Sequence, residues 1–253
     1  MSESKKYIFT KEVKKWGVEA GDYYSKDYHQ IVGGLEKLID DGVVKEEIEP
    51  YSIVWDLETT GFVAPAAKIL EIGCFIVRGD EVERKHWVLD NKCEIPEKIT
   101  EITGIDQAII DAEGRDPREC LNEFLPLFKN CELNITHNGI KFDIPFLLNT
   151  ATDLLDWTET QRSAAKSVMM DTAFDTAPCV KGKKLEMSQM DGEPFVQFAE
   201  RVMNVRAYGV YYKLVDSLKE EGVTLDVEAH RAMADVEMTH ALYKIVKEYD
   251  CIL

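Results

Sequence analysis

Residues 51–61 read YSIVWDLETTG, a short apolar run that carries two acidic residues and ends in a Thr-Thr-Gly turn. β-branched and aromatic residues of this kind favour a strand. Because side chains alternate between the two faces of a strand, Asp56 and Glu58 should project from the same face. Two neighbouring carboxylates repel each other unless a cation binds both, and hard oxygen ligands suit Mg²⁺ or Mn²⁺. The chain holds four other Asp-x-Glu sequences, so a solvated strand end is the alternative interpretation of this pair taken alone.

A second acidic position follows ELNITH at residues 132–137, which is another strand candidate. The chain continues through Asn138 to Asp143, where an apolar helical run begins. A single acid near a helix start is usually a cap, so Asp143 by itself favours a structural role.

The third segment is HRAMAD, which starts at His230 and ends at Asp235. Helical residues advance about 100° each, so five steps would place these two side chains about 140° apart on one continuous helix. They can converge only if His230 lies in the preceding loop and Asp235 lies in the helix. A lone histidine is more often structural than catalytic, which is the alternative for His230.

Strands and helices alternate after residue 51. Residues 68–77 and 83–89 are two further strand candidates, joined by a turn at Arg78-Gly79-Asp80. Asp116-Pro117 matches an N-cap and first helical position for a helix that continues to Phe128. The rest is expected to be mostly helical and to end in a long amphipathic helix near residues 230–248. This order predicts an α/β domain with a mixed sheet.

Residues 1–50 differ from the rest and are expected to form an N-terminal helical extension, with the main domain at 51–253. Apolar residues recur there at helical spacing and are followed by Gly42, as at a helix stop. The stripe consists of Tyr28, Ile31, Val32, Leu35, Leu38 and Ile39. Two interpretations stay open: the stripe packs on the main domain, or the extension is a separate module that docks on a partner or contacts DNA.

Composition narrows the class of protein. The chain has 253 residues and a formal net charge of −17, so its surface repels phosphate backbones and tight nucleic-acid binding by charge alone is not expected. The N-terminus shows no apolar signal segment, and no run is long enough to span a bilayer. The six cysteines have no C-x-x-C spacing and are expected to be reduced thiols. We therefore expect a cytoplasmic protein.

The order Asp-x-Glu, then His-Asn-x-x-x-Phe-Asp, then His-x-x-x-x-Asp resembles the DEDD superfamily of 3′-5′ exonucleases. It is most similar to the branch with a histidine in the third motif, the DEDDh branch. That branch includes proofreading exonuclease subunits of DNA polymerases, RNase T and three-prime repair exonucleases. The resemblance covers about residues 51–248 and extends to the linking sequences Ile95-Pro96, Ile102–Ile105 and Met170-Asp171-Thr172.

The resemblance implies a ribonuclease H-like mixed sheet flanked by helices. It implies hydrolysis of phosphodiester bonds from a free 3′ end, with release of 5′-monophosphates. Carried over by motif, Asp56, Glu58, Asp143 and Asp235 would hold two divalent metal ions, Mg²⁺ or Mn²⁺. Two such ions stabilise the attacking and leaving oxygens of a phosphodiester. His230 would act as general base, since imidazole exchanges protons near neutral pH.

Other positions are candidates for substrate contact. Phe62 occupies the place where family members set an apolar side chain against the terminal bases, and Thr59 and Asn138 would contact the terminal nucleotide. Segment 176–200 looks like an insertion, and its basic cluster could guide a strand or lie in a solvated loop; it consists of Lys181, Lys183 and Lys184. Three tyrosines are expected in the core or an interface: Tyr208, Tyr211 and Tyr212.

The expected substrate is DNA, at single-stranded or frayed 3′ ends. An exoribonuclease that trims RNA ends or short oligoribonucleotides is the alternative within enzymes, because 2′-OH contacts cannot be placed from this sequence. A catalytically silent module that binds nucleic acid or a partner is the non-enzyme alternative, and the complete set of carboxylates argues against it. Residues 1–50 could dock on a polymerase or another protein partner.

Overall fold

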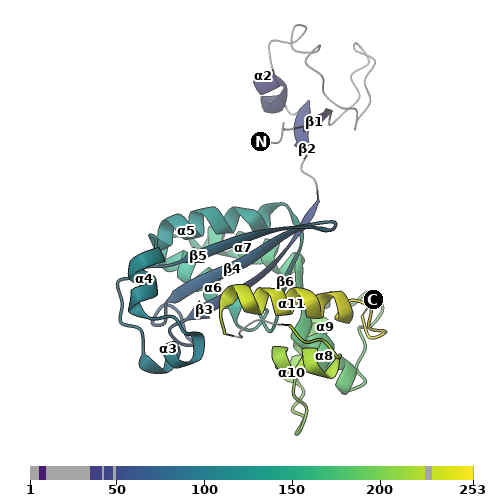
Figure 1. Cartoon of the computed structure of the whole chain (residues 1–253). Helices are drawn as coiled ribbons and strands as arrows, with labels where there is room; N and C mark the ends of the chain where they lie inside the picture. Colours follow the sequence, from purple (N-terminus) through teal and green to yellow (C-terminus); the bar gives the residue numbers. More distant parts are fainter. Residues whose placement is uncertain (1–5, 10–34, 42, 48–49, 226–229, 253) are drawn as a thin grey trace. The chain divides into compact units, whose positions relative to one another are not determined.

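The computed structural model describes residues 6–9, 35–41, 43–47, 50–225 and 230–252 (Figure 1). By its internal contacts the chain divides into two compact units, Met1–Glu49 and Pro50–Leu253. Each is described separately below.

The first unit contains a helix and a two-stranded antiparallel sheet. Strand β1 (Lys6–Phe9) pairs with β2 (Val44–Glu47), and helix α2 (Leu35–Asp40) precedes β2. Helix α2 lies inside the helical stripe expected from the sequence, while Tyr28, Ile31 and Val32 lie outside the described residues. The sheet was not expected, because each strand has only four residues and no alternating pattern marks it.

The second unit is built on a five-stranded mixed sheet with the order β5-β4-β3-β6-β7 (Figure 1). Strand β4 is antiparallel to both β3 and β5, whereas β6 runs parallel to β3 and β7 runs parallel to β6. The strands are β3 (Tyr51–Thr59), β4 (Ile69–Arg78), β5 (Glu81–Val88), β6 (Cys131–Thr136) and β7 (Ala173–Asp175). The first four were predicted. The prediction that the chain after β6 is helical missed β7, which has three residues.

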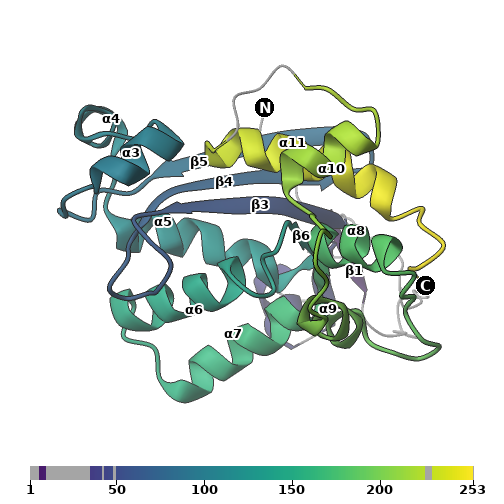
Figure 2. The same cartoon turned by 90° about the horizontal axis from the view of Figure 1, so that it is seen from below.

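Helices cover both faces of this sheet, and Figure 2 shows α5, α6 and α7 on one side and α10 and α11 on the other. The mixed sheet flanked by helices confirms the predicted fold class. The helices are α3 (Glu97–Thr103), α4 (Gln107–Glu113), α5 (Pro117–Phe124), the 3₁₀ helix η3 (Leu125–Lys129), α6 (Asp143–Leu154), α7 (Glu159–Asp171), α8 (Thr176–Lys184), α9 (Phe195–Asn204), α10 (Leu214–Glu220) and α11 (Ala232–Val246).

The helix predicted from Asp116 starts as expected. The Asp116 carboxylate accepts hydrogen bonds from the backbone N–H groups of Arg118 and Glu119, and Pro117 is the first helical residue. The α-helix ends at Phe124, and the chain continues as 3₁₀ helix η3. Pro126 explains this end, because its ring cannot donate the next helical hydrogen bond.

Strand β3 sends alternate side chains into two different cores. Ile53, Trp55 and Leu57 pack in the core beneath α5, α6 and α7, whereas Val54 packs in the core that includes α11. Trp55 is fully buried and meets the rings of two phenylalanines edge-on at 5.5 and 5.3 Å. By the same alternation Asp56 lies on the Val54 side of the strand. The apolar side chains therefore fix which face of the sheet receives the acidic ones.

Among the described residues, no helix combines the length and the apolar character that crossing a membrane requires. All six cysteines are free thiols, as expected.

Candidate active site

Three carboxylates converge at the end of β3. Asp56 and Glu58 lie two residues apart on this strand, and Asp235 lies in the first turn of α11. One carboxylate oxygen from each lies within 4.8 Å of the others, which is a separation that a single metal ion can bridge. The strand periodicity predicted the first pair, and α11, packed on that face, supplies the third acid.

His230 lies just outside the helix that carries Asp235. It has φ of 69°, and α11 begins two residues later at Ala232. The backbone N–H of His230 donates to Oδ1 of Asp235 at 3.2 Å. The predicted arrangement, with the histidine in the loop and the aspartate in the helix, is therefore confirmed. Both residues line a cavity of about 910 Å³, and the His230 side chain is exposed to solvent.

Asp143 is the first residue of α6 and is buried, with 4% of its surface exposed. It is not a cap, because the N-cap position is Phe142 and no side chain caps this helix. Its carboxylate instead accepts a hydrogen bond from the backbone of Leu57, between Asp56 and Glu58. Asp143 therefore faces β3 and lies close enough to Asp56 to repel it electrostatically.

The four acids lie in surroundings that disfavour negative charge. Burial is the largest cause of the raised pKa of each acid, and repulsion from other members of the group adds to it at Asp56, Glu58 and Asp143. At Asp235 the repulsion comes from Glu71 on β4. The pKa of Asp56 is raised well above its usual value, that of Glu58 is raised to about 8 and that of Asp143 to about 7. The pKa of Asp235 is also raised. Asp143 is buried and the other three acids are half-buried, and the cluster lacks the positive charge that a bound cation would supply.

The loop before Asp143 is held by a residue that the sequence did not reveal. Asp175 is 2% exposed and accepts hydrogen bonds from the backbone N–H groups of Asn138, at 2.6 Å, and Ile140, at 3.2 Å. It also caps α8 by accepting from the N–H of Ala177 at 3.0 Å. Asn138 has φ of 67°, in the left-handed region, so the loop needs this support. The Asp-Thr-Ala-Pro sequence at 175–178 is a helix-start signal that could have identified the cap.

The predicted substrate-contact residues border the site in different ways. Phe62 is 86% exposed, and its ring centroid lies 6.2 Å from that of Phe142, next to Asp143. Thr59 is buried, and its hydroxyl donates to the carbonyl of Gly61 at 2.7 Å. Asn138 lines the same cavity as His230. Phe62 is therefore the one of the three with a free apolar surface.

The prediction that the basic cluster lies in a solvated loop is wrong, because the cluster lies on helix α8. Lys181 is 5% exposed and donates to the carbonyls of Met203 and Val205. Lys183 and Lys184 form ion pairs with α10 and the residue that follows it. A helix places the three ammonium groups against neighbouring carbonyls and carboxylates, which the spacing alone did not show.

Of the two places expected for the tyrosines, the core is excluded for Tyr208 and Tyr211, which are 105% and 63% exposed, and an interface stays a prediction. Tyr212 is half-buried and packs against the core that includes α11. Tyr211 and Tyr212 line the cavity that holds His230 and Asp235.

The sequence profile of the RNase_T exonuclease family matches residues 53–243. The PolC-type DNA polymerase III of Clostridium perfringens is 33% identical over 111 residues, which cover 44% of this chain and 8% of the polymerase. The PolC-type enzyme of Caldanaerobacter subterraneus is 24% identical over 204 residues, which cover 72% of this chain and 14% of the polymerase. The chain thus spans a small part of the length of these relatives.

Solved structures share the fold. Escherichia coli Exonuclease I in complex with a dA16 oligonucleotide superposes with a TM-score of 0.60 at 17% identity, covering 79% of this chain and 41% of that one. Exonuclease I in its apo form gives a TM-score of 0.60 at 16% identity, covering 80% of this chain and 43% of that one.

Proposed function

The chain belongs to the RNase_T exonuclease family, in the DEDD superfamily of 3′-5′ exonucleases, and from this premise we propose that it removes nucleotides from the 3′ end of DNA. The reaction is hydrolysis of the terminal phosphodiester bond with release of a 5′-nucleoside monophosphate. The observation that carries the proposal is the convergence of Asp56, Glu58 and Asp235 at one end of β3, with His230 lining the same cavity as Asp235.

The acidic cluster fits divalent cations. The donors are all carboxylate oxygens, which are the ligands that Mg²⁺ and Mn²⁺ prefer, and their raised pKa values mark a deficit of positive charge. We propose that Asp56, Glu58, Asp143 and Asp235 hold two such ions. When bound, the ions would stabilise the negative charge that develops on the phosphate and lower the pKa of the attacking water.

His230 is the proposed general base. Its backbone is anchored to Asp235, while its ring is exposed in the cavity and makes no hydrogen bond within the described residues. The ring is therefore free to accept a proton from the attacking water. The left-handed backbone at His230 turns the chain so that it does not continue the line of α11.

The proposed DNA contact is local. Phe62 offers an exposed ring for stacking on a terminal base, a contact that contributes about 1–3 kcal/mol regardless of base identity. Thr59 and Asn138 are the other proposed contacts. A chain with a net charge of −17 gains little from phosphate contacts, so affinity should change little with salt. The choice of DNA is supported by the DNA polymerase relatives and by the oligonucleotide complex of the structural neighbour.

We also propose that the unit Met1–Glu49 docks the exonuclease unit on a protein partner that delivers nucleic-acid ends. Support comes from its separation from the exonuclease unit and from relatives in which the matching segment is a small part of a polymerase.

The test is a gel assay on matched 5′-labelled single-stranded DNA and RNA, with Mg²⁺ or Mn²⁺ and an EDTA control. The variants are Asp56→Ala and His230→Ala, with Asp111→Ala as control because it belongs to another Asp-x-Glu, on α4 and outside the cluster. We expect a metal-dependent ladder that shortens from the 3′ end of DNA, retained in the control and lost in both site variants. Faster cleavage of RNA would reassign the substrate. No cleavage by the folded wild type would leave a binding module as the function.

A further inference from the structure

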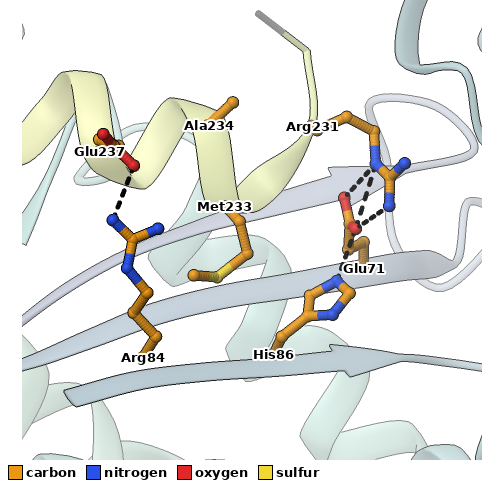
Figure 3. Close-up of a pocket in the computed structure, with 7 residues that line it drawn as sticks. All are labelled: Glu71, Arg84, His86, Arg231, Met233, Ala234 and Glu237. Carbon is orange, nitrogen blue, oxygen red and sulfur yellow. Dashed lines mark hydrogen bonds and ion pairs between the residues drawn. The ribbon is translucent and has the colours of Figure 1, made fainter. Parts of the chain in front are cut away.

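Glu71 is a buried acid beside the site that the proposed chemistry does not use. It lies on β4 opposite Glu58 in the antiparallel register and is 1% exposed. Its charge adds to the repulsion that raises the pKa values of Asp56, Glu58 and Asp235, so a carboxylate at this position needs partners of its own. Figure 3 shows that it has them: its side chain lies between Arg231 and His86.

Every partner of the Glu71 carboxylate is within normal hydrogen-bond distance. The Nη2 of Arg231 donates to Oε1 at 2.7 Å, and its Nε lies 3.2 Å from both oxygens. The backbone N–H of Ala232 donates to Oε2 at 2.9 Å, and Nε2 of His86 lies 2.6 Å from Oε1. Burial raises the pKa of Glu71, but the bonds from His86 and Arg231 outweigh burial and lower it to about 2. The carboxylate is therefore ionised at neutral pH.

Two of these partners, Arg231 and Ala232, connect His230 to helix α11. Arg231 directly follows His230, and Ala232 is the first residue of α11. Their bonds to Glu71 therefore hold the two residues that join the proposed general base to the helix carrying Asp235. The N-cap residue of α11, Arg231, does not cap the helix with its side chain. Glu71 on strand β4 instead accepts the hydrogen bond from the first backbone N–H of the helix, that of Ala232.

The backbone of β4 adds a second constraint at the same point. Gly73 lies two residues after Glu71, so a side chain there would point to the same face of the sheet. A Cβ atom at Gly73 would lie 2.7 Å from the carbonyl carbon and oxygen of Ala232. Real Cβ atoms do not approach so closely, so α11 starts in direct backbone contact with β4. Glu71 and Gly73 together fix where this helix begins relative to the sheet.

We propose that Glu71 is a positioning residue of the exonuclease site: through Arg231 and the start of α11 it holds His230 and Asp235 in place against Asp56 and Glu58 on β3. This inference rests on the function proposed above. Glu71 touches neither the reacting atoms nor, through any bond described here, the four acids.

The test variants are Glu71→Gln, which keeps the shape and removes the charge, and Arg231→Lys, which keeps the charge and removes the two-pronged contact. The control is Arg84→Met. Arg84 lines a pocket together with Glu71 and Arg231, and it pairs with Glu237 of α11 at 2.9 Å (Figure 3). Its side chain is 59% exposed. Misplacement of catalytic groups by about 1 Å can cost 100-fold in rate. We expect kcat to fall about 10- to 100-fold in both test variants with KM unchanged, and no change in the control.

Hydrogen–deuterium exchange of the peptide spanning residues 230–236 provides a readout that does not need activity. Exchange should be faster in both test variants and unchanged in Arg84→Met. A wild-type kcat in a folded Glu71→Gln variant would overturn the inference, even if the melting temperature fell, because that result describes a purely structural residue. If the wild type cleaves no substrate, the proposed function fails, and unchanged exchange would then reject the positioning role on its own.

Discussion

Replacement of Asp175 by alanine should destabilise the second unit by more than the loss of an ordinary helix cap. The carboxylate accepts from three backbone N–H groups, at Asn138, Ile140 and Ala177. The cap bond to Ala177 contributes about 1 kcal/mol. Each of the other two donors would be left without its partner, at a cost of about 1–3 kcal/mol. The gross loss is therefore about 3–7 kcal/mol.

Part of this loss is offset because the alanine variant no longer buries a charged carboxylate. Burial raises the pKa of Asp175 to about 6, so the ionised form is disfavoured in the folded protein at pH 7. A shift of this size corresponds to about 3 kcal/mol that the alanine variant no longer bears. The net prediction is a decrease of about 0–4 kcal/mol, with a midpoint of about 2 kcal/mol, in the free energy of unfolding for Asp175→Ala. Asp175→Asn should lose less, because its amide oxygen still accepts.

The assay is urea unfolding at pH 7 in EDTA, followed by tryptophan fluorescence. Asp116→Ala is the matched control, since Asp116 caps α5 through two backbone N–H groups at an exposed site and should cost about 1 kcal/mol. Equal losses for Asp175→Ala and Asp116→Ala would refute the claim that Asp175 supports the Asn138–Ile140 loop. Because this loop precedes Asp143, the variant should also lose nuclease activity in proportion to its effect on the loop.

Four further predictions concern the site and the core. The pKa of Glu58 is raised to about 8, so the metal-free protein should lose stability as pH rises from 4.5 through 8. Mg²⁺ should restore the melting temperature. A melting temperature that does not change with pH in EDTA would contradict this prediction. For the same reason Asp56→Asn should melt higher than the wild type in EDTA while cleaving nothing. Gly73→Ala should lower kcat and stability together, because its methyl group meets Ala232. Phe124→Ala removes a fully buried ring that packs on those of Trp55, Trp87 and Phe128, and should cost about 3–5 kcal/mol in urea unfolding.

Local patterns predicted the parts of the site that depend on local geometry. The two-residue period of a strand placed Asp56 and Glu58 on one face, and the 100° step of a helix required His230 to lie outside α11. Both arguments involve residues at most five positions apart. The core strands followed from their apolar runs for the same reason.

The missed features depend on partners far away in the sequence. The loop N–H groups that donate to Asp175 lie 35 and 37 residues earlier in the chain. The carbonyls that accept from Lys181 lie 22 and 24 residues later. Glu71 and Arg231 are 160 residues apart. Strand β7 has three residues, which is too short for any period to be detected. None of these could be recognised before the elements were placed in space.

Strand β5 forms one edge of the sheet, and this position bears on how the protein behaves at high concentration. An edge strand presents unpaired backbone groups on which another chain can add a strand and begin to aggregate. Charged side chains occupy much of β5, and Glu81, Glu83 and Arg84 are exposed. A second copy of β5 would have to strip these charged side chains of water. The same eight residues that complete the sheet therefore also discourage its extension from one molecule to the next.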